Sequence, residues 1–435
     1  MQVAYWDEQW ETKPLEELKE LQLKKFKKQL QHIYKNQFYR NRFKETGLEP
    51  GDITNWEDIP KVPFTFKSDL RDNYPKGLLS GNWEEVVRIH MTSGTTGAPT
   101  ILAYTKNDLD VWAECMARNF VAGGLTTSDI VQQAHGLGLF TGGFGFHYGL
   151  ERVGAKVIPT GAGGTDRQLR LMQEWGTTVF TGTPSYAAYM AEIAIEKGID
   201  PVKDLNLRLG FHGGEPCSDG LRKRINERLG YRAHGGGMRV CYGLTEMGGP
   251  MSMDCECECG QHVWADHYLM EIIDPATLDY VNEGEPGELV ISNLSFEAMP
   301  ILRYRTGDRV NVSVEKCECG RTHPRISGFL GRVDDMILVS GTNVFPSQVE
   351  YVLLKHASLS ENWQLIVEDK RGLHTIKVEI EPATGCVIDQ TFVTVLEKEL
   401  HSHLEIKCGV DIKDGGTLPR FEGKAARVVD RREKG

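Results

Sequence analysis

The chain has 435 residues, a formal net charge of −11 and 40% hydrophobic residues. This acidic balance disfavours a nucleic-acid partner, and the sequence has no run of about 18 apolar residues that could cross a membrane. The N-terminus lacks a basic segment followed by an apolar stretch. We therefore expect a cytoplasmic protein with two or three domains.

The predicted elements begin with a surface helix and continue as alternating strands and helices. Between Leu15 and Ile33, large apolar residues recur every three to five positions among lysines and glutamates, which predicts an amphipathic helix. From residue 86 onward, short apolar runs such as VVRIHM and TTVFTGTP end in Gly, Thr or Pro and alternate with helical patterns. This alternation predicts an α/β fold whose loops gather at the strand ends.

The pattern changes near residue 332, where the chain reads as strand, helix, hairpin, helix and strand. Alternate positions from Ile376 to Ile380 are apolar in the hairpin, and the following helix carries leucines on one face. We therefore predict a large domain over residues 1–331 and a small domain over residues 332–435, joined by a short hinge.

Several short motifs suggest a phosphate-bearing ligand. The loop TSGTTG at 92–97 follows an apolar run, and its amides and hydroxyls are suited to an anion, although the loop alone also fits an ordinary turn. Five motifs follow in this order: GGEP (213–216), YGLTE (242–246), YRTGD (304–308), GRVDD (331–335) and PRFEGK (419–424). An ordered set of this length makes chance agreement negligible.

Together these motifs resemble the core motifs of the acyl-adenylate-forming superfamily. Flanking stretches such as VPFTFKSDLRDNYP, TGTPSYAAYM and LPRFEGKAARVVDRR are similar to the phenylacetate-coenzyme A ligase family, and the resemblance covers nearly the whole chain. It implies a large multi-layer N-terminal adenylation domain and a small mobile α/β C-terminal domain. It also implies an ATP- and Mg²⁺-dependent acid–thiol ligase that activates an aromatic acid as acyl-AMP and transfers the acyl group to coenzyme A.

Alternatives to this function remain open at the sequence level. An adenylating synthetase that passes the acyl group to an amine or a carrier-protein thiol is the main one, because the acceptor leaves no clear motif. A catalytically inactive nucleotide sensor is disfavoured, since Glu246, Asp308 and Lys424 are all present. The identity of the acid and the presence of a homodimer stay undecided.

The resemblance also implies a role for each motif residue. The β and γ phosphates of ATP would lie on Ser93, Gly94, Thr95, Thr96 and Gly97. The catalytic set would be Thr245, Glu246 and Lys424, in which Glu246 holds Mg²⁺ and Lys424 bridges the carboxylate and the α-phosphate. The nucleoside would contact Gly214, Glu215, Pro216, Tyr242, Gly243, Asp308 and Arg332. In that set Tyr242 would lie on the adenine face and Asp308 would accept hydrogen bonds from both ribose hydroxyls.

Two further positions concern charge and motion. Most relatives carry a basic residue at the position of Ala98, so we expect weaker ATP binding but intact chemistry, because Mg²⁺ and Lys424 make the larger electrostatic contributions. Asp334 matches the hinge about which the small domain of this superfamily rotates between the two half-reactions.

The acyl pocket is expected to be lined by His135, Leu137, Phe140, Gly214, Cys241 and Pro250. His135 and Leu137 replace aromatic residues that are typical of aryl-acid ligases. A polar or hydroxylated aromatic acid would suit His135, because a buried imidazole requires a hydrogen-bond partner. A purely structural histidine is the alternative.

Two cysteine-rich loops, DCECECGQHVW and KCECGRTHPRI, indicate a metal site. Thiols in tight clusters of a large, unsecreted chain favour metal over disulfides, and the two loops bring donors within reach of a tetrahedral Zn²⁺ ion. The resemblance to zinc-bearing family members favours Cys255, His262, Cys317 and Cys319. Cys257 and Cys259 are rivals for the first position, and His323 is a weaker one. Four protein ligands would make the zinc structural.

Overall fold

The structure is a computed structural model that describes residues 4–92, 99–332, 337–339, 342–370, 373–421 and 427–431. The predicted phosphate loop 93–97, Ala98, the hinge residue Asp334 and the predicted catalytic Lys424 lie outside the described residues. The remaining predicted site residues lie within them. In the part of the chain that is described, no helix combines the length and apolarity needed to cross a membrane.

The chain divides into two compact units. The first unit comprises Met1–Gly161, Val179–Thr181 and Arg239–Phe329, and the second comprises Ala162–Thr178, Gly182–Met238 and Leu330–Gly435. This division by contacts groups a central part of the chain with the C-terminal part. The domain boundary at 331/332 stays a prediction.

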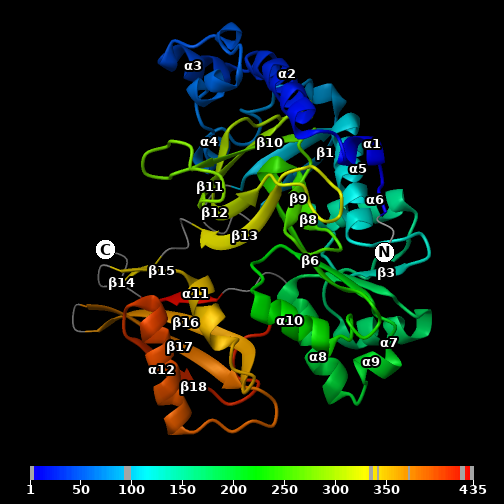
Figure 1. Cartoon of the computed structure of the whole chain (residues 1–435), viewed down its shortest axis with the longest axis vertical. Helices are drawn as coiled ribbons and strands as arrows, with labels where there is room; N and C mark the ends of the chain where they lie inside the picture. The colour runs from blue at the N-terminus through cyan, green and yellow to red at the C-terminus, as the bar shows by residue number, and fades with distance from the viewer. Residues whose placement is uncertain are drawn as a thin grey trace. The chain divides into compact units, whose positions relative to one another are not determined.

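The first unit combines helices with a mainly antiparallel sheet (Figure 1). Its helices are α1 (Glu8–Glu11), α2 (Leu15–Ile33), α3 (Gln37–Thr46), α4 (Lys67–Asp72), α5 (Lys106–Ala122) and α6 (Thr141–Val153), with 3-10 turns η1 (Pro50–Asp52), η2 (Trp56–Lys61), η3 (Trp83–Glu85) and η4 (Thr245–Met247). Its strands are β1 (Val86–Met91), β2 (Ile101–Thr105), β3 (Ile130–Gln133), β4 (Lys156–Ile158), β5 (Val179–Gly182), β7 (Gly237–Leu244), β8 (Gly249–Asp254), β9 (Gln261–Val263), β10 (Tyr268–Ile273), β11 (Gly287–Asn293), β12 (Tyr304–Ser313) and β13 (Arg325–Arg332).

The strands of this unit pair in three groups. One group has the order β10-β11-β12-β13-β9-β8-β7, and the pairs β10/β11, β11/β12, β13/β9, β8/β9 and β7/β8 are antiparallel. β3 pairs in parallel with both β4 and β5, and β1 pairs with β2 as an antiparallel ribbon. α5 packs against α6 and β8. The mixture of strands and helices confirms the predicted α/β class.

Local sequence explains two helices that later position the site. α2 buries Leu18, Phe26 and Leu30 on one face, as the amphipathic pattern predicts. α5 begins at a capping box, in which the Thr105 hydroxyl accepts from the Asp108 amide at 3.1 Å and the Thr105 amide donates to Asp108 Oδ2 at 2.9 Å. The start of α5 is therefore determined by its own sequence.

The second unit contains a further α/β arrangement. Its helices are α7 (Thr165–Trp175), α8 (Pro184–Glu196), α9 (Pro201–Asp204), α10 (Asp219–Arg228), α11 (Pro346–Leu353) and α12 (Gln390–Leu404). Its strands are β6 (Leu209–Gly213), β14 (Ile337–Val339), β15 (Thr342–Val344), β16 (Leu359–Lys370), β17 (Leu373–Pro382), β18 (Cys408–Ile412) and β19 (Val428–Asp430).

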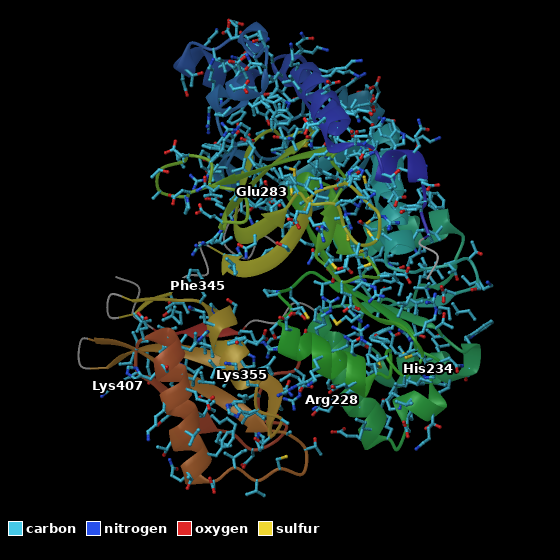
Figure 2. All side chains as sticks on the ribbon, viewed as in Figure 1. Arg228, His234, Glu283, Phe345, Lys355 and Lys407 are labelled. Atoms are coloured by element: carbon cyan, nitrogen blue, oxygen red, sulfur yellow. The ribbon has the colours of Figure 1, made fainter. Side chains whose placement is uncertain are left out.

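The C-terminal part of this unit is a four-stranded sheet with the order β18-β17-β16-β19. The predicted hairpin is β16/β17, whose register pairs Val367 with Ile376. α12 packs against α11 and β18, and its buried leucines join one apolar core with the sheet (Figure 1). Phe345, labelled in Figure 2, precedes α11, and its amide donates to Gln348 Oε1 at 3.0 Å. The predicted order of elements is therefore observed.

Candidate active site

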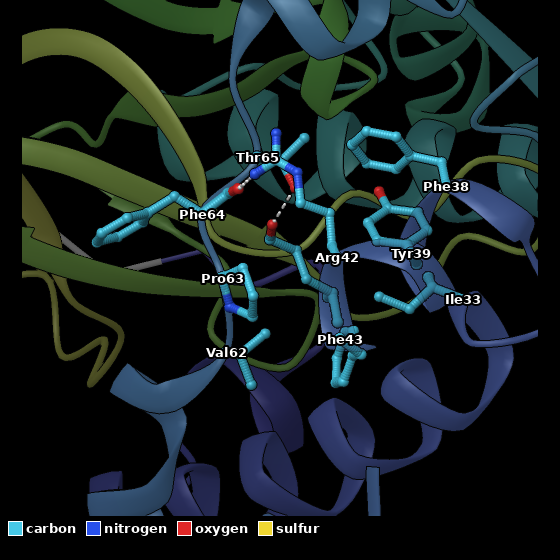
Figure 3. A pocket seen from close by; sticks show the side chains of 10 residues that line it. Ile33, Phe38, Tyr39, Arg42, Phe43, Val62, Pro63, Phe64 and Thr65 are labelled. Carbon is cyan, nitrogen blue, oxygen red and sulfur yellow. Dashed lines mark hydrogen bonds between the residues drawn. The ribbon is translucent and has the colours of Figure 1, made fainter. Parts of the chain in front are cut away.

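The N-terminal helices determine where α4 begins. Figure 3 shows Arg42 of α3 beside Phe64 and Thr65, and the Arg42 guanidinium donates to the Phe64 carbonyl at 3.1 Å and pairs with Asp69. Asp69 in turn accepts from the Phe66 amide at 2.8 Å, and the Thr65 hydroxyl donates to the Leu302 carbonyl at 2.8 Å. The first residue of α4, Lys67, is therefore held by contacts on both sides.

Lys67 and Thr100 converge on the predicted magnesium ligand. Lys67 Nζ lies 3.8 Å from Glu246 Oε1, and the side chains are 42% and 5% exposed respectively. The buried Thr100 hydroxyl donates to the same Glu246 oxygen at 3.2 Å. The sequence prediction identified Glu246 but not these two partners. Lys67 stands in the quoted stretch VPFTFKSDLRDNYP, where nothing distinguishes it from a surface lysine.

Thr100 also closes the base of the predicted phosphate loop. The Thr92 amide donates to the Thr100 carbonyl at 2.9 Å, and the Thr100 amide donates to Thr92 Oγ1 at 3.0 Å. Thr92 and Thr100, which stand on either side of positions 93–99, are therefore held together by two hydrogen bonds. Thr100 thus links Thr92 to the Glu246 carboxylate.

Glycines allow the chain to turn sharply around Glu246. Thr245 and Glu246 are buried in η4, which ends at Met247, and the two residues that follow η4, Gly248 and Gly249, have φ angles of 95° and 97°, which L side chains rarely adopt. A Cβ on Gly243 would lie 2.1 Å from the Gly249 carbonyl oxygen. The predicted residue Gly243 is therefore required by backbone packing.

A tyrosine and a carboxylate meet on neighbouring motifs. The Tyr242 hydroxyl donates to Asp308 Oδ2 at 2.6 Å, and the Asp308 amide donates to the Thr306 hydroxyl at 3.0 Å. The Tyr242 ring also lies 5.2 Å from the Phe329 ring. The structure therefore joins two predicted nucleoside residues that are 66 positions apart in the sequence.

The other predicted nucleoside residues lie in the second unit. Gly214 has a φ angle of 89°, and Glu215 accepts a hydrogen bond from the Ser185 amide. A cavity of about 80 Å³ is lined by Glu215, Pro216, Leu221, Gly331, Arg332, Phe345, Pro346, Ser347, Glu350, Trp363 and Arg427. Burial raises the pKa of Glu350 and lowers the pKa of Arg427. Three residues of the predicted nucleoside set therefore share one charged cavity.

The predicted acyl-pocket residues differ in exposure. His135 is buried, its Nδ1 lies 3.2 Å from Thr181 Oγ1, and its ring centroid is 4.2 Å from that of Phe146. Cys241 and Pro250 are also buried, and burial raises the pKa of the Cys241 thiol. Leu137 and Phe140 are exposed. One nitrogen of His135 is therefore already paired within the protein, as the structural alternative requires.

The structure brings the four favoured metal ligands together. Cys255, His262, Cys317 and Cys319 are buried, and their donor atoms all lie within 4.8 Å of one another. Cys255 Sγ is 3.7 Å from Cys317 Sγ, and Cys319 Sγ is 3.4 Å from His262 Nε2. Tetrahedral Zn²⁺ with its usual bond lengths separates two sulfurs by about 3.8 Å and a sulfur and a nitrogen by about 3.5 Å. The donor set therefore fits zinc.

The rival ligands are less suited to this site. Cys257 is exposed, and Cys259, which is only partly buried, donates to the Cys257 carbonyl. Both ring nitrogens of His323 face backbone groups, the Ala265 amide at 2.9 Å and the Trp10 carbonyl at 2.8 Å. Spacing alone did not decide whether Cys255, Cys257 or Cys259 is the first zinc ligand. Burial favours Cys255.

The N-terminal segment supports the second cysteine loop. The Tyr5 hydroxyl donates to the Cys319 carbonyl at 3.1 Å, and Arg321 Nε donates to the fully buried Glu11 carboxylate at 2.6 Å. Arg321 also donates to the Ala4 carbonyl at 2.7 Å. The ligand loop and the first described residues of the chain therefore form one packed region.

Comparisons with known proteins agree with this geometry. The profile of the AMP-binding enzyme family matches residues 10–296, and that of the AMP-binding enzyme C-terminal domain matches residues 341–432. Phenylacetate-coenzyme A ligase from Pseudomonas putida is 42% identical over 97% of this chain and 96% of its own length. The enzyme of that name from Thermus thermophilus is 40% identical over 97% of this chain and 98% of its own length.

A solved structure with a similar fold extends the comparison. This structure is that of 2-hydroxyisobutyryl-CoA ligase, solved in the postadenylation state in complex with R3-HIB-AMP. The superposition covers 99% of the present chain and 93% of the ligase chain, with a TM-score of 0.91 and 28% sequence identity. The family resemblance seen in the motifs is thus confirmed. The chain belongs to the phenylacetate-coenzyme A ligase family of the adenylate-forming superfamily, and it is an AMP-forming acid–CoA ligase.

Proposed function

We propose that this ligase acts on an aromatic acid of the phenylacetate type. In the first half-reaction a carboxylate oxygen of the acid attacks the α-phosphorus of ATP, and pyrophosphate leaves. In the second, the sulfur of coenzyme A attacks the acyl carbon, and AMP leaves. The name of the relatives at 42% and 40% identity supports phenylacetate as the first substrate to test.

The observation that carries the proposal is the arrangement around Glu246. Its buried carboxylate accepts from Thr100 at 3.2 Å, and the Thr100 amide donates to Thr92, which directly precedes Ser93 of the predicted phosphate loop. Glu246 would hold Mg²⁺, which supplies positive charge to the phosphate oxygens of ATP.

Lys67 adds a fixed positive charge next to this carboxylate. Its Nζ lies 3.8 Å from Glu246 Oε1 and its side chain remains partly exposed, so it is available to phosphate oxygens that approach the same site. Ala98 provides no charge within the loop. Lys67 would therefore supply a positive charge that Ala98 does not.

The nucleoside would be held by residues of three motifs. Asp308, positioned by the Tyr242 hydroxyl at 2.6 Å, would accept hydrogen bonds from the ribose, and Tyr242 would present its ring to the adenine. Arg332 would lie near the ribose and the phosphate. Lys424 would stabilise the charge that develops at the α-phosphorus, an assignment that rests on family resemblance.

We also propose that the Cys255, His262, Cys317 and Cys319 cluster holds one structural Zn²⁺. All four ligand positions are then filled by protein, so the ion would support the fold and not the reaction. The ligand loop is joined through Arg321 and Glu11 to the N-terminal segment, so metal binding would stabilise that segment as well.

A substrate panel tests the function. Pyrophosphate release is measured with phenylacetate, 4-hydroxyphenylacetate, benzoate and 2-hydroxyisobutyrate, each with and without coenzyme A, and the thioester product is identified by mass. We expect the highest kcat/KM with an arylacetic acid and thioester formation only with coenzyme A. A preference for 2-hydroxyisobutyrate would overturn the aromatic assignment. Acyl-AMP that forms but reacts only with an added amine would favour the alternative acceptor.

A further inference from the structure

Three aromatic side chains in the first unit bury polar atoms that have no protein partner. His90 of β1, Tyr104 of β2 and Trp112 of α5 are each at most 1% exposed. Their ring centroids lie 5.4 to 5.7 Å apart in every pairwise combination. Within the described part of the chain, His90 Nε2, the Tyr104 hydroxyl and Trp112 Nε1 make no hydrogen bond. Buried polar atoms are rarely left unpaired, so three in one cluster require an explanation.

The donor and acceptor pattern of the cluster is complementary to one water molecule. His90 Nδ1 lies 3.0 Å from the Leu139 carbonyl oxygen, which can only accept, so Nδ1 carries the ring proton. In the neutral ring, Nε2 is then an acceptor, whereas Tyr104 and Trp112 offer an O–H and an N–H. A water molecule accepts two hydrogen bonds and donates a third, which satisfies all three groups.

Burial keeps the histidine in this neutral form. Desolvation lowers the pKa of His90, and the Leu139 carbonyl only partly opposes this effect. The Phe144 ring lies 5.5 Å from the His90 ring and covers it further. The tautomer of His90 therefore depends on the hydrogen-bond partner of each ring nitrogen.

Two glycines let the backbone pack closely against the edge of the indole. A Cβ on Gly145 would lie 2.8 Å from Trp112 Nε1, and a Cβ on Gly249 would lie 2.8 Å from Trp112 Cζ2, so neither position admits a side chain. Gly249 directly precedes Pro250, a predicted pocket residue. The cluster therefore packs against the backbone of α6 and β8.

His90 also contacts the segment that begins the acyl pocket. The Leu139 carbonyl accepts from His90 at 3.0 Å and from the Met91 amide at 3.0 Å. Leu139 directly precedes Phe140, which caps the start of α6 and is a predicted pocket residue. Met91 directly precedes Thr92, at the base of the phosphate loop. The Leu139 carbonyl thus links β1 to the segment that contains the predicted pocket residue Phe140.

We propose that one internal water binds His90 Nε2, the Tyr104 hydroxyl and Trp112 Nε1, and that it thereby maintains the tautomer in which His90 positions Leu139 and the acyl-pocket segment 136–140. His90 is a positioning residue in this account, because it touches neither substrate. The kinetic part of the proposal rests on the proposed function, since it assumes that segment 136–140 contacts the acid.

The water itself is tested without any activity measurement. A crystal structure of the wild-type protein at a resolution that shows ordered water should contain a density peak within hydrogen-bond distance of all three atoms. Tyr104→Phe removes only the hydroxyl and should lower the Tm. Tyr268→Phe calibrates the shift, because the buried Tyr268 hydroxyl donates to the Met247 carbonyl at 3.2 Å. A dry cluster, or a Tm that rises in Tyr104→Phe, would overturn the water site, since loss of an unpaired hydroxyl stabilises a protein.

The positioning role is tested with two amides that each mimic one ring nitrogen. His90→Asn keeps a donor near the Nδ1 position, and His90→Gln keeps a polar group near Nε2 but removes the donor to Leu139. We expect His90→Gln to raise the KM for phenylacetate about tenfold, the effect of one lost hydrogen bond, while His90→Asn stays within about twofold. The KM for ATP should change little in either variant, which a general folding defect would not reproduce.

Two outcomes would contradict the positioning role. One is an unchanged KM for phenylacetate in His90→Gln, and the other is an equal loss for acid and ATP in both variants. Crystal structures of the two variants give the same answer without a substrate, because segment 136–140 should move in His90→Gln and not in His90→Asn. If the wild-type protein fails to use phenylacetate, the proposed function is wrong, while the density, Tm and segment positions still decide this inference.

Discussion

Replacing Thr100 by valine tests how Glu246 is positioned. Valine has the shape of threonine without the hydroxyl, so the buried site is filled but the hydrogen bond to Glu246 Oε1 at 3.2 Å is lost. A hydrogen bond to a charged group contributes about 1.5–3 kcal/mol. Lys67, 3.8 Å away and 42% exposed, can offset at most about 1 kcal/mol, because exposed ion pairs are screened by solvent. The net loss of about 0.5–2 kcal/mol corresponds to an about 2- to 30-fold lower rate.

The assay is acid-dependent pyrophosphate release at varied concentrations of Mg²⁺ and ATP. We expect Thr100→Val to lower kcat/KM for ATP by about 2- to 30-fold, and Thr100→Ser, which keeps the hydroxyl, to remain within about twofold of the wild type. Thermal unfolding of both variants controls for the contacts with Thr92. Equal kinetics in Thr100→Val and Thr100→Ser would refute the idea that this hydroxyl positions the carboxylate.

Three further predictions concern single side chains. Lys67→Met removes a charge next to Glu246 and should raise the KM for ATP about tenfold with little effect on the KM for the acid. An unchanged KM for ATP would show that Lys67 does not contact the phosphates. Elemental analysis should find about one Zn²⁺ per chain. Cys317→Ser should lower both the zinc content and the Tm, whereas Cys386→Ser, at an exposed cysteine, should change neither. A full zinc content in Cys317→Ser would show that Cys317 is not a ligand. Lys424→Ala should slow acyl-adenylate formation by about 10²-fold or more but should convert supplied acyl-adenylate with coenzyme A at near the wild-type rate. Asp334→Pro should instead impair the rotation of the small domain between the two half-reactions. Equal loss of both half-reactions in Lys424→Ala would refute the role of the lysine.

The sequence was sufficient for those features that depend on local pattern. The apolar spacing of α2 and the β16/β17 hairpin predicted elements that the structure contains, because amphipathic periodicity determines which face is buried. The motif residues Tyr242 and Asp308 were predicted as neighbours of one ligand, and the structure joins them at 2.6 Å. The structure therefore brings these two motif residues together, and their roles toward a nucleotide stay predictions.

Features that depend on packing between distant segments could not be predicted in this way. Lys67 resembles any solvated lysine at a helix start, and its distance of 3.8 Å from Glu246 is seen in the folded chain, where Arg42 of α3 contacts Phe64 and Asp69 on either side of it. Thr100 reaches Glu246 across 146 positions of sequence. Neither pairing leaves a local pattern that a sequence-based argument could use.

The cysteine loop and the pocket histidine illustrate the same limit. Cys255, Cys257 and Cys259 alternate along one segment, so spacing cannot choose between them, whereas burial of Cys255 beside Cys317 does. His135 was expected to require a hydrogen-bond partner. The partner of its Nδ1 atom is the hydroxyl of Thr181 in β5. The parallel register of β3 and β5, which pairs Gln133 with Thr181, makes this contact, and register is a property of the folded sheet.

The most direct test of the central claim is acid-dependent exchange of labelled pyrophosphate into ATP in the absence of coenzyme A. This exchange requires reversible formation of an enzyme-bound acyl-adenylate, so it reports the first half-reaction without assuming an acceptor. We predict exchange with phenylacetate that is abolished without the acid and is strongly reduced in Glu246→Gln. Coenzyme A thioester formation from phenylacetate without any such exchange, or exchange that is independent of the acid, would contradict the acyl-adenylate mechanism proposed for this chain.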